Sequence, residues 1–430
     1  MLKRTTILTA AASTGLLFGA MALPAVADIR HDAVVAENPL DSTPHVLDGV
    51  VNAIAVVGDT VVVGGKFTQV RNSASGSPVQ SRINIFSYNK KTGQIDSGFA
   101  PEVDGEVATL EAGMDGTVYV GGLFGLINGE SARRLALLNV ADGTRNQTFA
   151  QSEINWGKVN VIVRRGNNLY VGGRFDAITD NVTGEQRHNL AKLNAVTGAI
   201  DPNFDIVISN PRRGELMVKD LAVDPNDAKL IIDGTFTTVN GERRYQIAMI
   251  DLGETATLST WETDMYGNTC DPEYDTYMRG IDFSPDGSYF VVVTTGGAGY
   301  GPVGLCTSAA RWEADRTGPV QQPTWANYTG GDTLMSVAVT GAAVYVGGHQ
   351  RWMDNRLGYE NPAPGSVSRE GIAAIDPTTG KSADVPWNPT RTRGEGAGVL
   401  TATADGLLVG SDTDQLGGEF HGRIGEFPLP

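Results

Sequence analysis

The sequence is poor in cysteine, aromatic residues and charge. Of its 430 residues, two are cysteine, 7% are aromatic and 19% are charged. Low charge combined with 41% hydrophobic residues excludes a disordered chain and predicts a packed core. Beyond residue 27, no apolar run approaches the about 20 residues that a membrane-spanning helix needs. No stretch keeps a helical period over three turns, which excludes a helical bundle.

The motifs of common catalytic and metal sites are also missing. None of the five histidines belongs to a spaced zinc motif. The chain contains no GxSxG nucleophile elbow and no phosphate-binding loop that ends in GK[ST]. The segment "CDPEYD" offers alternating oxygens from Asp271, Glu273 and Asp275, but its spacing differs from that of known calcium loops. We therefore expect no cofactor, with calcium at this segment as the alternative.

The first 27 residues have the pattern of a secretion signal. Lys3 and Arg4 precede the apolar stretch "TILTAAASTGLLFGAMAL", and Ala25-Val26-Ala27 is a small-residue cleavage site. We expect the mature chain to begin at Asp28 and to be secreted, with a retained leader acting as an anchor as the alternative. Removing the leader takes away two positive charges and no negative one, so the formal net charge changes from -16 to -18. Such acidity disfavours nucleic acid and anionic membranes as partners.

Glycine is the residue in excess, with 54 copies against an average of about 7%. A phrase that ends in a glycine pair recurs at intervals of about fifty to sixty residues, which is typical of a four-stranded propeller blade. The copies are "VVVGGKF" at 61, "VYVGGLF" at 118, "LYVGGRF" at 169, "LIIDGTF" at 230 and "VYVGGHQ" at 344, with weaker copies "FVVVTTGG" at 290 and "LLVGSDT" at 407. Seven copies predict an all-β protein, a seven-bladed β-propeller of four-stranded blades.

Each unit divides into four strands. Residues 157–204 contain "KVNVIVRRG", "LYVGGRF", "LAKLNA" and "AIDPNF", separated by turns and by one long loop between the second and third strands. The glycine pair suits a bulge or a close approach of two backbones, where a side chain would not fit.

The two ends of the chain complement each other. The last unit stops after its third strand, "RIGEFPLP", while "DSTPHVLDGVVNAI" from Asp41 resembles "DSGFAPEVDGEVATL" from Asp96, where one blade ends and the next begins. We therefore predict that residues near 41–47 complete the last blade, so that an N-terminal strand closes the ring. The expected organisation is a signal peptide at 1–27, an N-terminal extension at 28–40 and a single propeller domain at 41–430.

The repeat unit, "LYVGGRF...NGE.R..LA.L...TG...P.F", resembles the delta-sixty type of β-propeller repeat of secreted bacterial proteins. The resemblance covers nearly the whole mature chain and departs most at "VVVTTGGAGYG" in the fifth unit. It implies an exported propeller and carries no catalytic motif.

The loops between second and third strands share one face of such a propeller with the connections between blades, and they vary from unit to unit. Variable loops on a rigid scaffold are common positions for binding groups. Cys270 and Cys306 both fall on this face in neighbouring units, and an even cysteine count in an exported protein predicts a disulfide between them.

The longest loop on this face, "HQRWMDNRLGYENPAPGSVSRE" from His349, interrupts the repeat with donors, a cationic fork and flat apolar surfaces. That mixture binds sugars by stacking or carboxylates by bidentate pairing. The alternative is structural, with Trp352 covering the end of its blade and His349 replacing a core phenylalanine. Tyr300 comes from an adjoining segment and could contribute to the same concavity. The candidate ligand-binding residues are His349, Gln350, Arg351, Trp352, Arg356, Tyr359, Trp325 and His421.

An arginine also recurs just before the third strand in six of the seven units. A residue that recurs with the blade favours a structural role, such as bonding loop carbonyls, and the alternative is a ring of arginines that binds an anion at the channel mouth. The residues are Arg82, Arg134, Arg187, Arg244, Arg369 and Arg423.

Together these features predict a monomeric, extracellular binding or interaction module that recognises a saccharide, a small anionic ligand or another extracellular protein. The alternatives are a polysaccharide hydrolase or lyase, with an acid pair and His349 or His421 at the channel mouth, and a purely structural cell-surface protein.

Overall fold

The computed structural model describes residues 29–267, 270–297 and 304–430, and these residues form strands and loops without any helix. The prediction of an all-β protein is confirmed. In the same residues there is no helix of the length and apolar character that crossing a membrane requires. The predicted leader at 1–27 lies outside the described residues, as does Tyr300.

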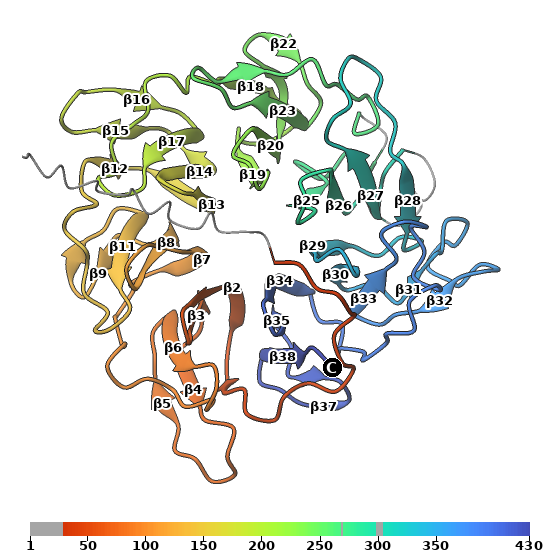
Figure 1. Cartoon of the computed structure of the whole chain (residues 1–430), viewed down its shortest axis with the longest axis horizontal. Coiled ribbons are helices and arrows are strands. Elements are labelled where there is room, and N and C mark those ends of the chain that lie inside the picture. The colour runs from red at the N-terminus through yellow and green to blue at the C-terminus, as the bar shows by residue number, and fades with distance from the viewer. Residues whose placement is uncertain (1–28, 268–269, 298–303) are drawn as a thin grey trace, which may run out of the picture.

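Seven antiparallel sheets of three or four strands, built from the described residues, follow one another around a ring (Figure 1). The first three sheets are β2 (Val50–Val57), β3 (Thr60–Lys66) and β6 (Ile85–Asn89); β7 (Glu106–Ala112), β8 (Thr117–Leu123) and β11 (Leu135–Asn139); and β13 (Gly157–Arg165), β14 (Asn168–Phe175) and β17 (Leu190–Asn194). The next two are β19 (Val218–Val223), β20 (Lys229–Gly234), β23 (Ile247–Asp251) and β24 (Thr257–Leu258); and β25 (Met278–Phe283), β26 (Tyr289–Thr294), β27 (Ser308–Glu313) and β28 (Trp325–Tyr328). The last two are β29 (Leu334–Val339), β30 (Val344–Gly348) and β33 (Ile372–Ile375); and β34 (Ala397–Thr403), β35 (Gly406–Ser411) and β38 (Ile424–Pro428).

The first strand of each sheet lies nearest the centre of the ring (Figure 1). These inner strands contact one another in chain order from β2 to β34, and β34 in turn contacts β2. The ring of inner strands thus leaves a channel along its axis, which several side chains line.

An outer fourth strand is present in the sheets that contain β24 and β28. Three other sheets have a single bridge at the same position, namely Tyr88 with Ile95, Leu138 with Arg145 and Leu193 with Ile200. The fourth strands are therefore shorter than the sequence pattern predicted.

In the described residues, small hairpins form the long loops between second and third strands in six of the seven sheets. They comprise β4 (Gln69–Arg71) with β5 (Gln80–Ser81), β9 (Leu126–Ile127) with β10 (Glu130–Ser131), β15 (Ile178–Asp180) with β16 (Gln186–Arg187), β21 (Phe236–Val239) with β22 (Glu242–Arg243), β31 (Trp352–Met353) with β32 (Val367–Ser368), and β36 (Gln415–Leu416) with β37 (Glu419–Phe420). The segment that enters a sheet pairs with that sheet's own hairpin: β1 (His45–Val46) with β4, β12 (Ser152–Ile154) with β15, and β18 (Ile208–Pro211) with β21.

The recurring glycine pair lies where two backbones meet. A Cβ atom on Gly65 would lie 2.0 Å from the carbonyl oxygen of Val50 on the inner strand of the same sheet, and one on Gly64 would lie 2.5 Å from Val107 on the next sheet. Opposite each pair, the inner strand carries a bulge, as between Val51 and Ala53. The sequence prediction of a bulge and a close approach at these glycines is confirmed.

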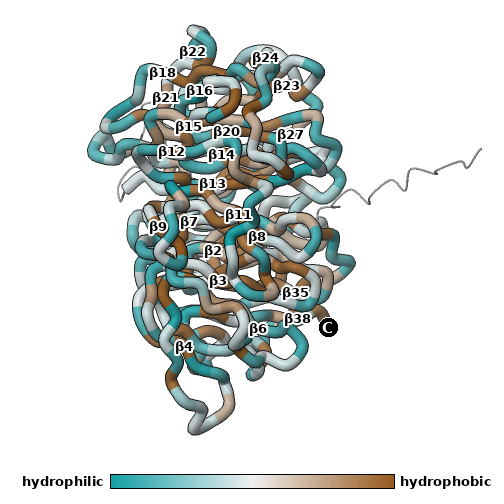
Figure 2. Tube along the Cα trace, turned by 90° about the vertical axis from the view of Figure 1, so that its left-hand side faces the viewer, coloured by the Kyte–Doolittle hydropathy of each residue, from teal (hydrophilic) through white to brown (hydrophobic). Residues whose placement is uncertain are grey.

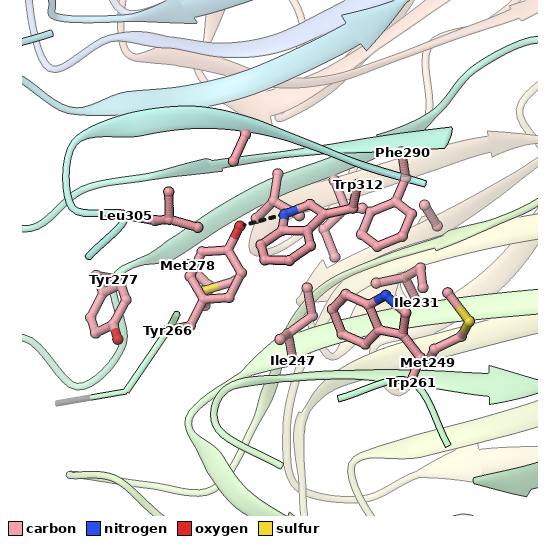
Figure 3. Packing of buried hydrophobic residues seen from close by; sticks show 14 of the residues in the cluster. Ile231, Ile247, Met249, Trp261, Tyr266, Tyr277, Met278, Phe290, Leu305 and Trp312 are labelled. Carbon is pink, nitrogen blue, oxygen red and sulfur yellow. Dashed lines mark hydrogen bonds between the residues drawn. The ribbon is translucent and has the colours of Figure 1, made fainter. Parts of the chain in front are cut away.

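The apolar core is divided among the contacts between neighbouring sheets. Apolar segments recur along the whole body in the side view, from β4 at one end to β22 at the other (Figure 2). Between the fourth and fifth sheets, Trp261 and Trp312 pack edge to face with ring centroids 5.4 Å apart, and the Trp312 indole N–H donates to the Tyr266 hydroxyl at 2.9 Å (Figure 3). The polar atom of this buried indole is thereby satisfied.

The N-terminal segment lies along the last two sheets (Figure 1). The backbone N–H groups of Ala36 and Leu40 donate to Pro428 and Glu426 of β38, at 2.7 and 2.8 Å. The internal resemblance of the segments from Asp41 and Asp96 predicts residues near 41–47 along the outer edge of the last sheet. His45 and Val46 instead form β1, which pairs with β4 of the first sheet, so the segment that lies along β38 comes earlier in the chain.

Cys270 and Cys306 form the predicted disulfide, with Cα atoms 5.6 Å apart and a sequence separation of 36 residues. Both sulfur-bearing side chains are buried in the cluster that contains Trp312.

Replacing both cysteines by serine is expected to lower the free energy of unfolding by about 3–4 kcal/mol, because a covalent loop of this length restricts the unfolded chain. Urea unfolding of the oxidised protein and of the double variant measures the difference. Equal midpoints, together with two free thiols in the wild-type protein, would refute the bridge.

Candidate functional site

Arg351, the predicted cationic fork, is paired within the chain. Its guanidinium donates to both carboxylate oxygens of Asp332 at 2.9 Å, and its backbone N–H donates to the same carboxylate at 3.0 Å. A second arginine, Arg393, lies 3.4 Å from Asp332, which is buried. The hydrogen bonds to Asp332 raise the pKa of Arg351, and the negative charge of Asp332 raises it further. The bidentate geometry that a ligand carboxylate would use is therefore occupied by Asp332.

His349 and Gln350 face the interior. The Nε2 atom of His349 accepts the backbone N–H of Thr333 at 3.2 Å, so this nitrogen carries no proton in the structure. Burial lowers the pKa of His349, and the charges of Arg393 and Arg351 act in the same direction against that of Asp332. Gln350 is completely buried, and its side-chain amide has no partner among the described residues. His349 is half-buried and Gln350 is buried.

Trp352 lies beneath the guanidinium of Arg351, whose central carbon is 4.6 Å from the ring centroid. The tryptophan is half-buried, whereas Tyr359 further along the loop is 60% exposed. Trp352 thus shares one face with Arg351, and Tyr359 is open to solvent.

Trp325 and His421 occupy different surroundings. Trp325 begins β28 and donates its indole N–H to the carbonyl of Pro377 at 2.8 Å. His421 follows β37 and packs against His45 with ring centroids 6.5 Å apart. Neither ring nitrogen of His421 has a partner among the described residues. Of these two residues, Trp325 borders a groove that the long loop also lines, and His421 belongs to the junction of the chain ends.

This groove, of about 370 Å³, runs along β28 between the fifth and sixth sheets. Trp325 and Tyr328 line it from β28, where they are 9% and 7% exposed. Arg356 comes from the long loop, and Lys381 comes from the turn after β33. The guanidinium of Arg356 lies 5.7 Å from the ring centroid of Tyr328. The side chains of Arg356 and Lys381 are exposed and form no hydrogen bond or ion pair with other described residues. Two free cations therefore border an aromatic groove.

Two carboxylates also line this groove: Asp384, which is exposed and accepts the hydroxyl of Thr379 at 2.6 Å, and Asp354, which serves the fold. One oxygen of Asp354 accepts the side-chain amide of Asn327 and the N–H of Ser382, and the other accepts the N–H of Ala383. These bonds hold the long loop against the turn that carries Lys381. The groove thus combines a fixed wall with free positive charges.

A second cavity, also of about 370 Å³, lies in the central channel and is lined by all seven inner strands. Each inner strand contributes the residue at its bulge, where the register shifts against the neighbouring strand. These bulged residues, here called the bulge layer, are Asn52, Ala108, Asn160, Lys219, Arg279, Met335 and Gly398.

The sequence interpretation did not identify the bulge layer. Its signal is present in the repeats, because the bulge falls at the same place in each first strand, yet the residue there differs from unit to unit. A variable position inside an otherwise regular buried strand indicates a side chain that does not serve the common core.

Two carboxylates stand beside Lys219. Asp220 accepts the N–H groups of Leu221 and Ile281 at 2.9 Å, and burial raises its pKa to about 6 despite these bonds. Asp233 is fully buried and accepts the N–H of Asp220; burial, followed by the charge of Asp220, raises the pKa of Asp233 well above its usual value. Three of the four oxygens of this acid pair therefore bond the backbone, and Oδ2 of Asp233 has no hydrogen-bond partner among the described residues. No histidine lines the cavity in the described part of the chain.

The six recurring arginines bond backbone carbonyls of the connections between sheets. Arg187 donates to Phe204, Arg134 to Gly157 and Arg423 to Gly49. The remaining donations are Arg82 to Asp96, Arg244 to Ser259, and Arg369 to Ser382 and Val385. This is the structural role that the sequence favoured, and none of the six borders the central cavity.

The segment considered for calcium is directed towards an arginine. Glu273 and Asp275 lie 3.2 and 3.9 Å from the guanidinium of Arg213, and Asp271 accepts the N–H of Glu273. Within the described ranges, no group of three or more His, Cys, Asp or Glu side chains could hold a metal ion.

Comparison with known proteins identifies one repeat directly. Residues 115–149 match the model of a β-propeller domain of unknown function, DUF5122, and this segment contains β8, β11 and the hairpin between them. No curated protein matches the chain. Among solved structures, the computationally designed Ika8 protein is similar, with 12% identity and a TM-score of 0.49 over 91% of this chain and 98% of that chain. The chain therefore contains a β-propeller repeat, and a β-propeller domain suggests an interaction module.

Proposed function

We propose that this protein is a secreted, seven-bladed β-propeller that binds a saccharide or a small anionic ligand in the groove beside β28. One observation carries the proposal: two cations without an ion-pair partner, Arg356 and Lys381, border a groove. The aromatic side chains Trp325 and Tyr328 lie in the wall of this groove. Aromatic surface with a few fixed polar groups is the usual composition of a small-molecule site. Secretion is supported by the disulfide, which persists in oxidising compartments.

The seven blades of the proposal correspond to the seven sheets of the ring, and closure is supported at three levels. Ala36 and Leu40 bond β38 from the N-terminal side. Arg423 bonds Gly49 as Arg134 bonds Gly157, so the junction of the chain ends repeats an ordinary connection. A Cβ atom on Gly410 would lie 2.6 Å from Val51, as one on Gly64 would from Val107 at 2.5 Å. No cofactor is part of the proposal.

The groove predicts preference for an acidic sugar. We expect glucuronate to bind the mature protein more tightly than glucose, because Arg356 and Lys381 can pair with the carboxylate while the sugar ring lies on the aromatic wall. The double variant Arg356→Ala/Lys381→Ala should bind glucuronate at least about tenfold more weakly, a loss of about 1.4 kcal/mol or more. Isothermal titration measures both affinities.

A matched control is Lys66→Ala, which removes an exposed cation at the end of β3. This variant should bind like the wild type, and all variants should keep the wild-type melting temperature, since the altered side chains are exposed. Equal glucuronate affinity in the wild type and the double variant would contradict the proposed site.

A further inference from the structure

The bulge layer is asymmetric around the channel. Lys219 and Arg279 are adjacent inner-strand residues, with Lys158 on the strand before them. On the other side of the channel the layer presents Ala108 and Gly398, which carry no charge. The charged residues of the bulge layer, Lys219 and Arg279, therefore lie side by side, while the carboxylates of Glu106 and Asp220 line the cavity at positions next to the layer.

Lys158 is neutralised by a carboxylate of the neighbouring inner strand, β7. Its ammonium group lies 3.1 Å from Glu106, which also accepts the amide of Asn52 at 3.0 Å. The charge of Lys158 is thus balanced without any ligand.

Lys219 has no such partner. Its ammonium group forms no hydrogen bond or ion pair with another described residue. Both oxygens of Asp220 and one oxygen of Asp233 accept backbone N–H groups, and Oδ2 of Asp233 has no hydrogen-bond partner among the described residues. Burial lowers the pKa of Lys219, the nearby charges of Arg279 and Lys158 lower it further, and the charges of Asp233 and Asp220 act in the opposite direction. A desolvated ammonium group without a counter-ion is costly, and proteins normally pair such a group.

Arg279 also lacks a carboxylate partner. It donates to the backbone carbonyls of Thr276 and Met278, at 3.0 and 2.7 Å, and lies over the ring of Tyr274. These contacts fix one edge of the guanidinium on the cavity wall. Its positive charge, like that of Lys219, has no ion-pair partner among the described residues.

We propose that the central channel is a second ligand site, in which Lys219 and Arg279 bind the oxyanion group of a small molecule. The cavity of about 370 Å³ is large enough for a small organic anion and lies within the usual range for small-molecule sites. The uncharged half of the bulge layer leaves room for the rest of such a molecule. Phosphate, sulfate and carboxylate groups share the required chemistry.

The test uses inorganic phosphate, inorganic sulfate and acetate as probes, titrated into the mature protein at constant ionic strength set with sodium chloride. Saturable binding of at least one probe is expected, and the three affinities show which oxyanion the site prefers. Lys219→Met should weaken that binding by about tenfold or more. The matched control Lys66→Met removes an exposed cation on β3 and should bind as the wild type does.

A second pair of variants tests the site without altering Lys219, in case Lys219→Met does not fold. Met335→Glu places a carboxylate in the bulge layer beside Arg279 and should abolish binding, whereas Met335→Gln should retain it. The groove variant Arg356→Ala/Lys381→Ala should bind the probes with wild-type affinity, which separates this site from the proposed groove. Absence of saturable binding by the wild type, or wild-type affinity in folded Lys219→Met or Met335→Glu, would overturn the proposal.

Discussion

A mature chain that lacks residues 28–48 is expected to be unfolded or aggregated at room temperature. The deletion removes Val35 and Val46, which are 3% and 0% exposed, and the hydrogen bonds of Ala36 and Leu40 to β38. Burial of two valines contributes about 3–6 kcal/mol and each backbone bond about 1 kcal/mol. A loss of about 5 kcal/mol or more equals the whole stability of many domains.

The deletion also exposes surface on the last two sheets. Trp387 loses the carbonyl of Ala36, to which its indole N–H donates at 3.1 Å, and Tyr345 loses the N–H of Val35 at 3.0 Å. The outer edge of β38 would then be free to pair with other chains.

Circular dichroism and size-exclusion chromatography measure the outcome. The control is a chain that begins at His31; the described residues that it lacks are the half-buried Ile29 and the exposed Arg30, so it should melt like the wild type. A folded, monomeric protein with unchanged melting temperature after deletion of 28–48 would show that the N-terminal segment is dispensable.

Acid is expected to weaken the same junction through His45. Burial, followed by the charges of Arg71 and His421, lowers the pKa of His45 to about 4 in the folded protein, against about 6.5 in the unfolded chain. Because the folded state resists protonation, the contribution of His45 to stability is complete above pH 6.5 and is lost as the pH falls towards 4. The loss amounts to at most about 3 kcal/mol.

The variant His45→Asn isolates this effect. His45 accepts the N–H of Gly422 through Nδ1 at 3.2 Å, and an asparagine oxygen can take that role without titrating. Asp220, whose pKa is raised to about 6, changes stability in the opposite direction, since its protonation favours the folded state. The difference in urea midpoint between wild type and variant at pH 7.5 and pH 5 therefore reports His45. A difference that does not change with pH would contradict the prediction.

The repeated parts of the molecule could be predicted because each is set by local chemistry that recurs. The alternation in "LAKLNA" predicts a strand, and the glycine pair predicts the close approach that Gly64 and Gly65 make to Val107 and Val50. The disulfide followed from a count of two cysteines and their places in the repeat. These features depend on neighbours in the chain or on the repeat itself.

The closing segment was misplaced by a few residues for a physical reason. Residues 41–47 align with the connection that follows a fourth strand, and they occupy that position, pairing with β4 as β12 pairs with β15. The segment that lies along β38 is "VVAENPL", in which Val35 is buried in the core while the bonds to β38 come from backbone N–H groups. Backbone pairing at an edge leaves a weak signal in the sequence.

The candidate site was predicted only in part, since its chemistry depends on partners from other sheets. Arg351 can bind a carboxylate with two parallel hydrogen bonds, but Asp332, in the connection before β29, already accepts both of them. Arg356 was among the predicted residues, whereas Lys381, which lines the groove from the turn after β33, was not. Which cation remains free is settled by the three-dimensional contacts.

The most direct test of the account is a glycan-array screen of the mature protein, performed in parallel with Arg356→Ala/Lys381→Ala. The account predicts that the wild type binds a set of acidic glycans and that the double variant loses them while remaining folded. Turnover measured on the same glycans would distinguish binding from hydrolysis or elimination. An array on which both proteins bind the same glycans equally, or on which the wild type binds none, would contradict the proposal of a saccharide-binding propeller.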